Sequence, residues 1–317
     1  MTHPFKPIDT GKLKTYSISE RKSNVSVDDF ATPWIKSGSF AEFIDSFPDI
    51  LAGTDLRMVI SSISEAFSKK KTVLAGMGAH VIKVGLNPVI IDLMKRGIIT
   101  AVAMNGAGII HDSEIAMTGR TSEDVAASLG DGSFGMARET GEFLNGAIKR
   151  AESQSMGLGE AVGKEIAEKN FPFRDKSILA AGAMLDVPVT VHVAIGTDII
   201  HMHPGFDGRA TGGATQRDFL IFASVVSTLS EGVYLNIGSS VILPEVFLKA
   251  TTLARNLGHD IDTFTAVNMD FIRQYRPMTN VVGRPTAKGG KGINLTGHHE
   301  IMLPLIAAGV IEAVNPP

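Results

Sequence analysis

Cysteine is absent from this sequence of 317 residues. Its absence excludes disulfides, thiolate nucleophiles, and zinc or iron–sulfur sites built on cysteine. A surplus of positive charge is also lacking. The formal net charge is −3, so no basic face is expected to recruit nucleic acid by counterion release. Long hydrophobic runs are missing too, because glycine, aspartate or histidine interrupts each apolar stretch before the roughly 18 residues that a membrane span needs.

The opening segment, MTHPFKPIDTGKLKTY, is polar and has no apolar core of the kind found in a signal peptide. Together with the missing membrane span, this predicts a cytoplasmic protein with no nucleic-acid or membrane partner. Residues 1–30 are polar and predict an N-terminal arm that packs on a neighbouring subunit or stays mobile. Residues 31–317 contain no linker and no internal repeat, so we expect a single domain there.

Segments of two kinds alternate along that domain. Strand-like segments are apolar nearly throughout and end in glycine or polar residues, at 72–76, 98–108, 186–200, 233–238 and 262–270. Helical spacing of apolar residues fills the intervals, at 40–53, 56–70, 87–97, 122–170, 213–230, 243–258 and 298–312. Strands that are apolar on both faces and alternate with helices predict an α/β fold with a Rossmann-like, doubly wound parallel sheet.

In such folds, ligands bind beyond the carboxyl ends of the strands. GMGAH (76–80) and IGSS (237–240) each join a strand to a helix through glycine, a form in which backbone N–H groups bind phosphate. Val81 replaces the third glycine of the full fingerprint, so a plain tight turn is the alternative. Asp270 is expected to accept ribose hydroxyls, or else to cap a turn. The predicted dinucleotide contacts are Gly76, Gly78, His80, Asn105, Gly106, Gly108, Thr197, Asp198, Gly238, Ser239, Asn268 and Asp270.

Histidines and aspartates near these loops are candidates for proton transfer, because histidine titrates near neutral pH. We name His111, Asp112, Asp198, His201 and His203 as catalytic candidates. An extended segment would point His201 and His203 the same way, which makes a metal site with Asp198 an alternative. His192 is predicted to be a core residue. For His298 and His299, helix capping competes with function.

Other segments give weaker signals. The glycine-rich run 289–292, with Lys288 and Lys291, predicts a flexible lid rather than an anion-binding loop. The nucleophile elbow G-x-S-x-G, the zinc signature H-E-x-x-H and the kinase signatures are all missing, so the sequence gives no support for those chemistries.

Several strings resemble the deoxyhypusine synthase family. AVGKEIAE (161–168) is similar to a helix of that family that contains G-K-E-I. The segment 72–97, followed by ITAVAMNGAG, resembles the family's first NAD-binding unit, and LDVPVTVHVAIGTD, VYLNIGSSVILPE and TFTAVNMD continue in the same order. The likeness covers roughly residues 28–308. It implies a Rossmann-like domain that binds NAD, a homotetramer, and active sites at subunit interfaces.

The resemblance also implies a reaction. In the family, NAD takes a hydride from spermidine, and the aminobutyl group passes through an imine on an enzyme lysine to a protein lysine or to putrescine. By our alignment of the turn after the fourth strand, Leu243 stands at the lysine position, and leucine forms no imine. Other family positions differ as well. The family's amine-binding acid aligns at or near His111, and a family histidine aligns with Asp186. A family tryptophan aligns near Leu303, and the family's NAD-contacting Ser-Asn pair aligns with Ala79-His80.

Four hypotheses therefore remain open. The first is an NAD-binding enzyme of this family that acts on a small amine-type substrate without the lysine imine. The second is a genuine deoxyhypusine or homospermidine synthase with a misaligned lysine. The third is a metal-dependent hydrolase at Asp198, His201 and His203. The fourth is a non-catalytic nucleotide-binding oligomer.

Overall fold

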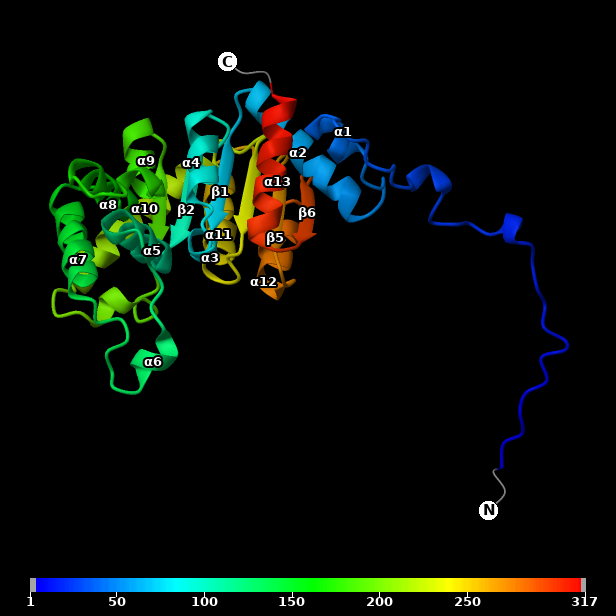
Figure 1. Ribbon diagram of the computed structural model, residues 1–317, viewed down its shortest axis with the longest axis horizontal. Helices are drawn as coiled ribbons and strands as arrows, with labels where there is room; N and C mark the ends of the chain where they lie inside the picture. The colour runs from blue at the N-terminus through cyan, green and yellow to red at the C-terminus, as the bar shows by residue number, and fades with distance from the viewer. Residues whose placement is uncertain (1–3, 315–317) are drawn as a thin grey trace.

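Six parallel strands form one sheet in the computed structural model, which describes residues 4–314 (Figure 1). The sheet order is β3-β2-β1-β4-β5-β6, so the direction of winding reverses between β1 and β4. This order is the one found in dinucleotide-binding domains, and the predicted doubly wound parallel sheet is confirmed. The strands are β1 (Val73–Met77), β2 (Ala101–Asn105), β3 (Val189–His192), β4 (Val233–Ile237), β5 (Thr265–Asp270) and β6 (Lys291–Thr296).

Burial explains why the central strands are mainly apolar. Every residue of β1, β4 and β5 is buried, because helices cover both faces of the sheet. Alternate residues serve different layers. Ala75 and Met77 belong to the larger apolar cluster on one face, whereas Leu74 faces a smaller cluster on the other. In that smaller cluster the rings of Tyr234 and Phe247 stack with centroids 3.8 Å apart.

The face of the sheet that carries the larger apolar cluster is covered by helices from both ends of the described chain. The α2 and α13 helices lie side by side and pack with α4, α8 and α9 over the larger cluster (Figure 1). The second face is covered by α10 and α11. The α-helices are α1 (Phe40–Asp45), α2 (Ala52–Ser68), α3 (His80–Lys83), α4 (Asn87–Lys95), α5 (Gly106–Thr118), α6 (Val125–Leu129), α7 (Arg138–Ser153), α8 (Leu158–Glu168), α9 (Ile178–Leu185), α10 (Gly208–Val226), α11 (Ile242–Asn256), α12 (Tyr275–Pro277) and α13 (His299–Ala313).

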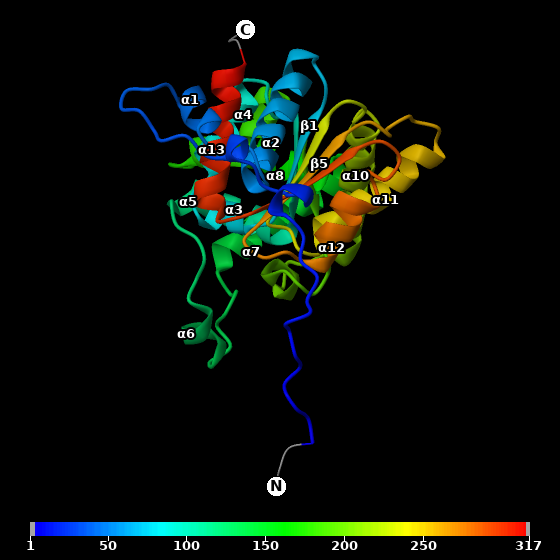
Figure 2. The same cartoon turned by 90° about the vertical axis from the view of Figure 1, so that its right-hand side faces the viewer.

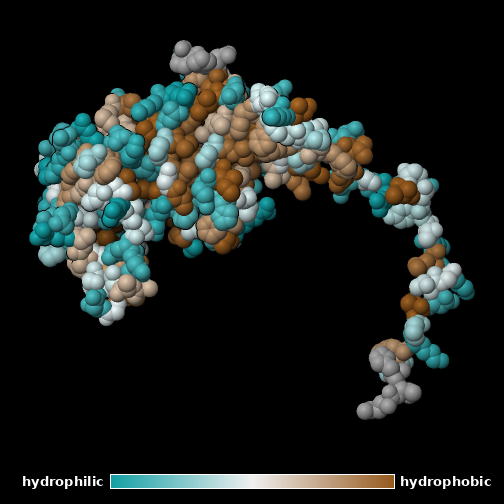
Figure 3. Space-filling model, in the orientation of Figure 1, coloured by the Kyte–Doolittle hydropathy of each residue, from teal (hydrophilic) through white to brown (hydrophobic). Residues whose placement is uncertain are grey.

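The segment before α1 extends away from the body of the molecule (Figures 1 and 2). It contains two short 3₁₀ turns, η1 (Ile18–Glu20) and η2 (Val27–Asp29). A capping box closes η2, in which the Ser26 hydroxyl accepts from the Asp28 N–H and Asp29 accepts from the Ser26 N–H. Apolar patches are visible along this segment (Figure 3). The exposed large apolar residues there include Ile8, Leu13, Tyr16, Ile18, Val25, Val27, Phe30, Trp34 and Ile35.

The sixth strand corrects the prediction of a flexible glycine-rich lid. Lys291 and Gly292 begin β6, which pairs with β5 from Thr265↔Lys291 to Asp270↔Thr296. The glycines at 289 and 290 therefore lie at the amino-terminal edge of the sheet, opposite the loops that follow the strands. Ile293 and Leu295 are buried, and they anchor this edge strand to the core. No helix within residues 4–314 is long and apolar enough to cross a membrane.

Candidate functional site

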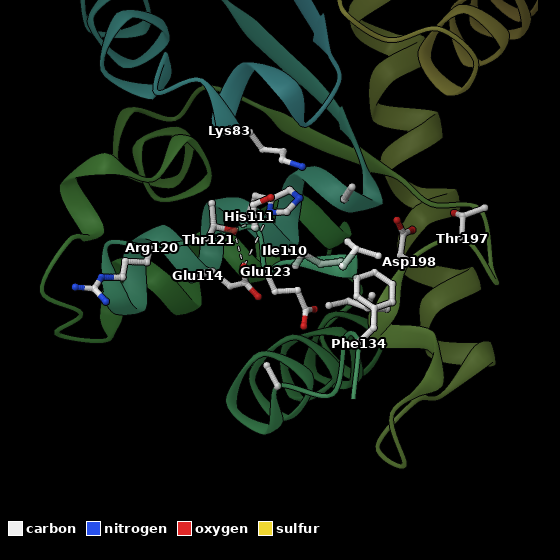
Figure 4. A pocket seen from close by; sticks show the side chains of 15 residues that line it. Lys83, Ile110, His111, Glu114, Arg120, Thr121, Glu123, Phe134, Thr197 and Asp198 are labelled. Atoms are coloured by element: carbon white, nitrogen blue, oxygen red, sulfur yellow. Dashed lines mark hydrogen bonds and ion pairs between the residues drawn. The ribbon is translucent and has the colours of Figure 1, made fainter. Parts of the chain in front are cut away.

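A cavity of about 460 Å³ lies beyond the carboxyl ends of β2 and β3 (Figure 4). Its floor is the first half of α5, and one wall is the segment between α5 and α7 that carries α6 (Figure 1). Ionisable and apolar side chains share the lining, so the cavity suits a small ligand with a polar head and an aliphatic stem. Among the lining residues are Lys83, Ile110, His111, Glu114, Thr121, Glu123, Phe134 and Asp198.

Asp198 brings a buried carboxylate to this cavity. The loop after β3 places it just before the 3₁₀ turn η4 (Ile199–Met202), where it is 9% exposed. Its Oδ2 has no hydrogen-bond partner among the described residues. The carboxylate packs on the start of α5, where a Cβ at Gly106 would lie only 2.0 Å from Oδ2. Burial raises the pKa of Asp198 to about 6, so it holds a proton more readily than an exposed aspartate.

His111 shares the cavity with two side chains that the sequence analysis did not single out. His111 and Glu114 lie three residues apart on α5, and so on one face of it. The His111 Nδ1 atom lies 2.6 Å from the Thr121 hydroxyl, which donates to Glu114 Oε2 at 2.5 Å. Burial, followed by the nearby Lys83 ammonium, lowers the pKa of His111 to about 4. His111 is therefore a neutral ring at physiological pH.

Asp112 follows His111 in the chain, but the structure places it outside the cavity. It is fully buried and accepts four hydrogen bonds, from Asn87 Nδ2, the Ser177 hydroxyl, and the N–H groups of Ile178 and Leu179. These contacts bind the N-terminus of α9 to α5. Burial raises the pKa of Asp112 to about 6 although all four bonds oppose it. The geometry gives Asp112 a structural role, and it corrects the expectation that it stands beside His111 in the site.

The two histidines of the same loop are not brought together. His201 lies within the 3₁₀ turn and His203 follows it, so the extended geometry that would align their rings is wrong. His201 Nδ1 accepts from the Gly196 N–H at 3.1 Å, whereas His203 Nε2 bonds the Gly135 carbonyl at 2.8 Å. Across residues 4–314, no three His, Cys, Asp or Glu side chains are grouped so that they could hold a metal ion.

The glycine turns after β1 and β4 meet at the point where the sheet order reverses. A Cβ at Gly78 would lie 2.4 Å from the Gly238 carbonyl oxygen, so the two turns touch backbone to backbone. Gly238 has φ +65, a left-handed conformation that favours glycine. Gly76 instead serves packing, since its Cα faces the Tyr234 ring. Of the predicted cofactor contacts, Gly78 and Gly238 therefore lie together in the crevice where such folds bind dinucleotides.

Several other predicted cofactor contacts are engaged within the protein. Asn105 caps α5 by accepting from the Gly108 N–H, and Gly108 lets that helix approach Met104. Thr197 donates to the Ala194 carbonyl. Ser239 accepts from the Leu243 N–H.

On the neighbouring strands, Asn268 links Asn236 to Asn294 in a side-chain ladder across β4, β5 and β6. Asp270 accepts from the Phe271 N–H at the end of β5.

His299 brings a buried imidazole to the β4 turn. It is 1% exposed, and neither ring nitrogen has a hydrogen-bond partner within residues 4–314. The ring rests on Gly238, where a Cβ would lie 2.4 Å from Nε2, and it lies 5.8 Å from the ring of His80. Neither His298 nor His299 caps α13 through its side chain, so capping does not explain them. His192 bonds Thr190 inside the core, as predicted.

Leu243, the residue aligned with the imine lysine, is completely buried on α11 within the smaller apolar cluster. Lys249, on the same helix, is exposed and pairs with Glu245. Lys83 is the lysine that lines the cavity, and it comes from the short helix α3. Lys83 could have been predicted from the sequence, because it lies on the helix that directly follows the GMGAH turn. Thr121 gave no such signal, because it lies in a loop.

The fold is a six-stranded parallel Rossmann-like sheet covered by helices, with a cavity at the carboxyl edge, and it is similar to the fold of a deoxyhypusine synthase-like structure. No family model matches the sequence, and no curated protein is significantly similar to it. Solved structures with a similar fold include the following three. A protein from Entamoeba histolytica, provisionally assigned as a deoxyhypusine synthase, has a TM-score of 0.53 and 12% identity. The match covers 90% of this chain and 98% of that one.

The other two neighbours are larger. The arginine dihydrolase ArgZ of the cyanobacterial ornithine-ammonia cycle has a TM-score of 0.52 and 13% identity, over 84% of this chain and 34% of that one. AgrE, in a ternary complex with ornithine and NAD⁺, has a TM-score of 0.50 and 12% identity, over 83% of this chain and 34% of that one. This chain thus spans about a third of the length of ArgZ and AgrE. At these identities the likeness shows the fold alone.

Proposed function

We propose that this protein is an enzyme that binds NAD at the β1 and β4 turns and acts on a small amine-bearing substrate in the adjoining cavity. One observation carries the proposal. Asp198, a buried carboxylate whose Oδ2 has no partner among residues 4–314, lines the cavity beyond β2 and β3, and β2 pairs with β1, one of the two strands between which the sheet order reverses. A buried carboxylate left unpaired is costly, and a cationic ligand would remove that cost.

Support for the amine comes from the charges around the cavity. Three carboxylates line it, from Glu114, Glu123 and Asp198. The cations there are Lys83 and Arg120, and Arg120 extends away from the other labelled side chains (Figure 4). The Glu114 oxygens already accept from Thr121 and Thr140, and one Glu123 oxygen accepts from the Gly135 N–H. Asp198 Oδ2 is the cavity carboxylate oxygen that is both buried and without a donor among residues 4–314, and the lining must shift for an ammonium group to reach it, while Ile110 and Phe134 suit the aliphatic stem.

Support for NAD comes from the strand order and the two glycine turns. The crevice between β1 and β4 is where such sheets bind dinucleotides, and AgrE, a neighbour in fold, was crystallised with NAD⁺. His299 adds a buried imidazole with unpaired nitrogens at the same turn. We propose that it hydrogen-bonds the bound cofactor.

Calorimetric titration with NAD⁺ tests the cofactor. Gly78→Ala places a methyl group against the Gly238 carbonyl and should weaken binding at least tenfold. Gly212→Ala is the matched control, because a Cβ there meets no atom within 4 Å. If the wild type binds no NAD⁺ in solution and carries none in a native mass measurement, the proposed function is wrong.

The lysine-imine reaction is a separate question. We propose that the chain does not use it, because the aligned position is the buried Leu243. Incubation with spermidine and NAD⁺, followed by borohydride and peptide mass spectrometry, should leave no aminobutyl group on any lysine. An adduct on a lysine would instead identify a genuine deoxyhypusine or homospermidine synthase.

We also propose a homo-oligomer, which the family resemblance suggests as a tetramer. The exposed apolar side chains of the N-terminal arm support this, because they find little cover on their own body. Native mass spectrometry of the full chain should report several subunits, and removal of residues 1–30 should lower that number. A monomeric full chain would contradict the proposal.

A further inference from the structure

His111 lies at one end of a chain of hydrogen bonds that runs through Thr121 to Glu114. The protons available on these groups decide which atom donates in each bond. Glu114 accepts at both carboxylate oxygens, from Thr121 at 2.5 Å on Oε2 and from Thr140 at 3.0 Å on Oε1. A carboxylate only accepts, and a threonine hydroxyl carries a single proton. The Thr121 proton is therefore committed to Glu114. Towards His111 the Thr121 oxygen is left with lone pairs alone.

The contact between His111 Nδ1 and the Thr121 oxygen, at 2.6 Å, consequently needs its proton on Nδ1. From this geometry we infer that Glu114 and Thr121 hold His111 as the neutral Nδ1–H tautomer, so that Nε2 is the proton acceptor of the cavity. His111 Nε2 has no hydrogen-bond partner among residues 4–314, and the atom is not fully enclosed by the protein. The lone pair is therefore open to a ligand. Glu114 and Thr121 are positioning residues, because they act through the ring.

The charges around the ring support the neutral form. Lys83 faces it from α3, Glu114 lies on its own helix, and Glu123 and Asp198 line the cavity from the loops before α6 and η4 (Figure 4). Lys83 opposes a second positive charge on the ring, and burial acts in the same direction. Only Glu114 is coupled to the ring by a continuous chain of hydrogen bonds. It would stabilise the imidazolium during a proton transfer.

The role of His111 rests on the proposed function. An ammonium group at Asp198 must lose a proton before its nitrogen lone pair can react. In that step the substrate N–H bond breaks, an Nε2–H bond forms, and the electron pair stays on the substrate nitrogen, so nothing is oxidised or reduced. The new positive charge is shared along Nδ1–H, Thr121 and Glu114. This arrangement is a general base held by a hydroxyl and a carboxylate.

The experiment reads the tautomer directly and needs no substrate. The full-length protein, labelled with ¹⁵N in its histidine rings, is examined by NMR at pH 7, and the His111 signal is identified by its loss in His111→Gln. We expect the proton on Nδ1. Thr121→Val keeps the side-chain shape but removes the hydroxyl, and it should shift the tautomer population towards Nε2–H. Thr121→Ser should restore the wild-type signal.

Thr140→Val is the matched control, since it removes the other Glu114 donor and leaves the His111–Thr121 contact in place. It should not change the tautomer. A wild-type proton on Nε2, or an unchanged tautomer in Thr121→Val, would overturn the inference. The test is independent of the cofactor. Missing NAD⁺ binding with the proton on Nδ1 refutes the proposed function alone, whereas NAD⁺ binding with the proton on Nε2 refutes this inference alone.

Discussion

Two buried aspartates, Asp112 of α5 and Asp218 of α10, contrast with Asp198 at the cavity. Asp112 binds the start of α9, and Asp218 binds the start of α8. Burial raises the pKa of all three, to about 6 for Asp112 and Asp198 and about 7 for Asp218. Their partners differ. Asp112 and Asp218 accept from backbone N–H groups, whereas Asp198 Oδ2 accepts from no donor in the described part of the chain. A raised pKa therefore does not separate the two structural carboxylates from the one that we propose binds a ligand, whereas the number of hydrogen-bond donors around each carboxylate does.

The largest expected effect comes from removing the best-satisfied carboxylate. Asp112→Ala leaves the Ile178 and Leu179 N–H groups and the Ser177 hydroxyl without their acceptor, and Asn87 Nδ2 keeps only its bond to the Lys176 carbonyl. We expect a loss of roughly 3–5 kcal/mol in the free energy of unfolding, measured by urea denaturation. Asp112→Asn keeps the shape and should lose less. A loss below about 1 kcal/mol for Asp112→Ala would break the comparison.

Asp218 should come second. It accepts from the Gly159 N–H at the start of α8 and from the Val191 N–H on the edge strand β3, so Asp218→Ala should cost about 2–3 kcal/mol. Hydrogen exchange at Val191 should speed up in the same variant. If exchange at Val191 stays as slow as in the wild type, Asp218 does not hold the edge strand.

The dependence of folding stability on pH tests the raised pKa of Asp218. Because the folded pKa is raised from 3.8 to about 7, the folded protein keeps a proton that the unfolded chain releases. The stability from this group is complete below pH 3.8 and is lost as the pH rises through about 7. Wild-type protein should therefore lose more stability than Asp218→Asn between pH 4 and pH 8, in paired urea titrations. Equal losses would contradict the raised pKa.

Asp198 should share the pH dependence of Asp218, but replacing it leaves no donor of the described residues without its acceptor at Oδ2. Asp198→Asn removes a buried charge that has no partner on Oδ2, so the variant should be more stable than wild type at pH 8 by on the order of 1 kcal/mol. The difference should vanish near pH 4, where wild-type Asp198 is protonated. The same variant should lose amine binding. A destabilised Asp198→Asn at pH 8 would place Asp198 with the structural pair.

The smallest effect is expected on the surface. Lys249→Ala breaks an exposed pair with Glu245, and such pairs contribute little, so unfolding should change by less than about 0.5 kcal/mol. NAD⁺ binding, measured by calorimetry, should not change either. Loss of turnover in this variant would show that Lys249 takes over the role of the lysine that Leu243 replaces.

The first five strands were predictable because each lies in a largely apolar run that ends at glycine or a polar residue. The edge strand β6 was missed because only one of its faces is buried, at Ile293 and Leu295, and glycines precede it. The pairing of His111 with Asp112 failed for a geometric reason. Consecutive helical residues point about 100° apart, so adjacency in sequence separated them in space. Thr121 was missed because it joins α5 from a loop that begins at the left-handed Gly119.

The order of the strands has a consequence for synthesis. The central strand β1 is made early, but its partner β4 follows only at Val233–Ile237, and α2 is covered only when α13 is complete. Contacts between residues so far apart in the chain form late and slowly. The crevice is completed last of all, since His299 of α13 rests on Gly238. During synthesis, most of the sheet is therefore made before the crevice is complete. Ligand binding would then indicate that the described chain has folded as far as α13.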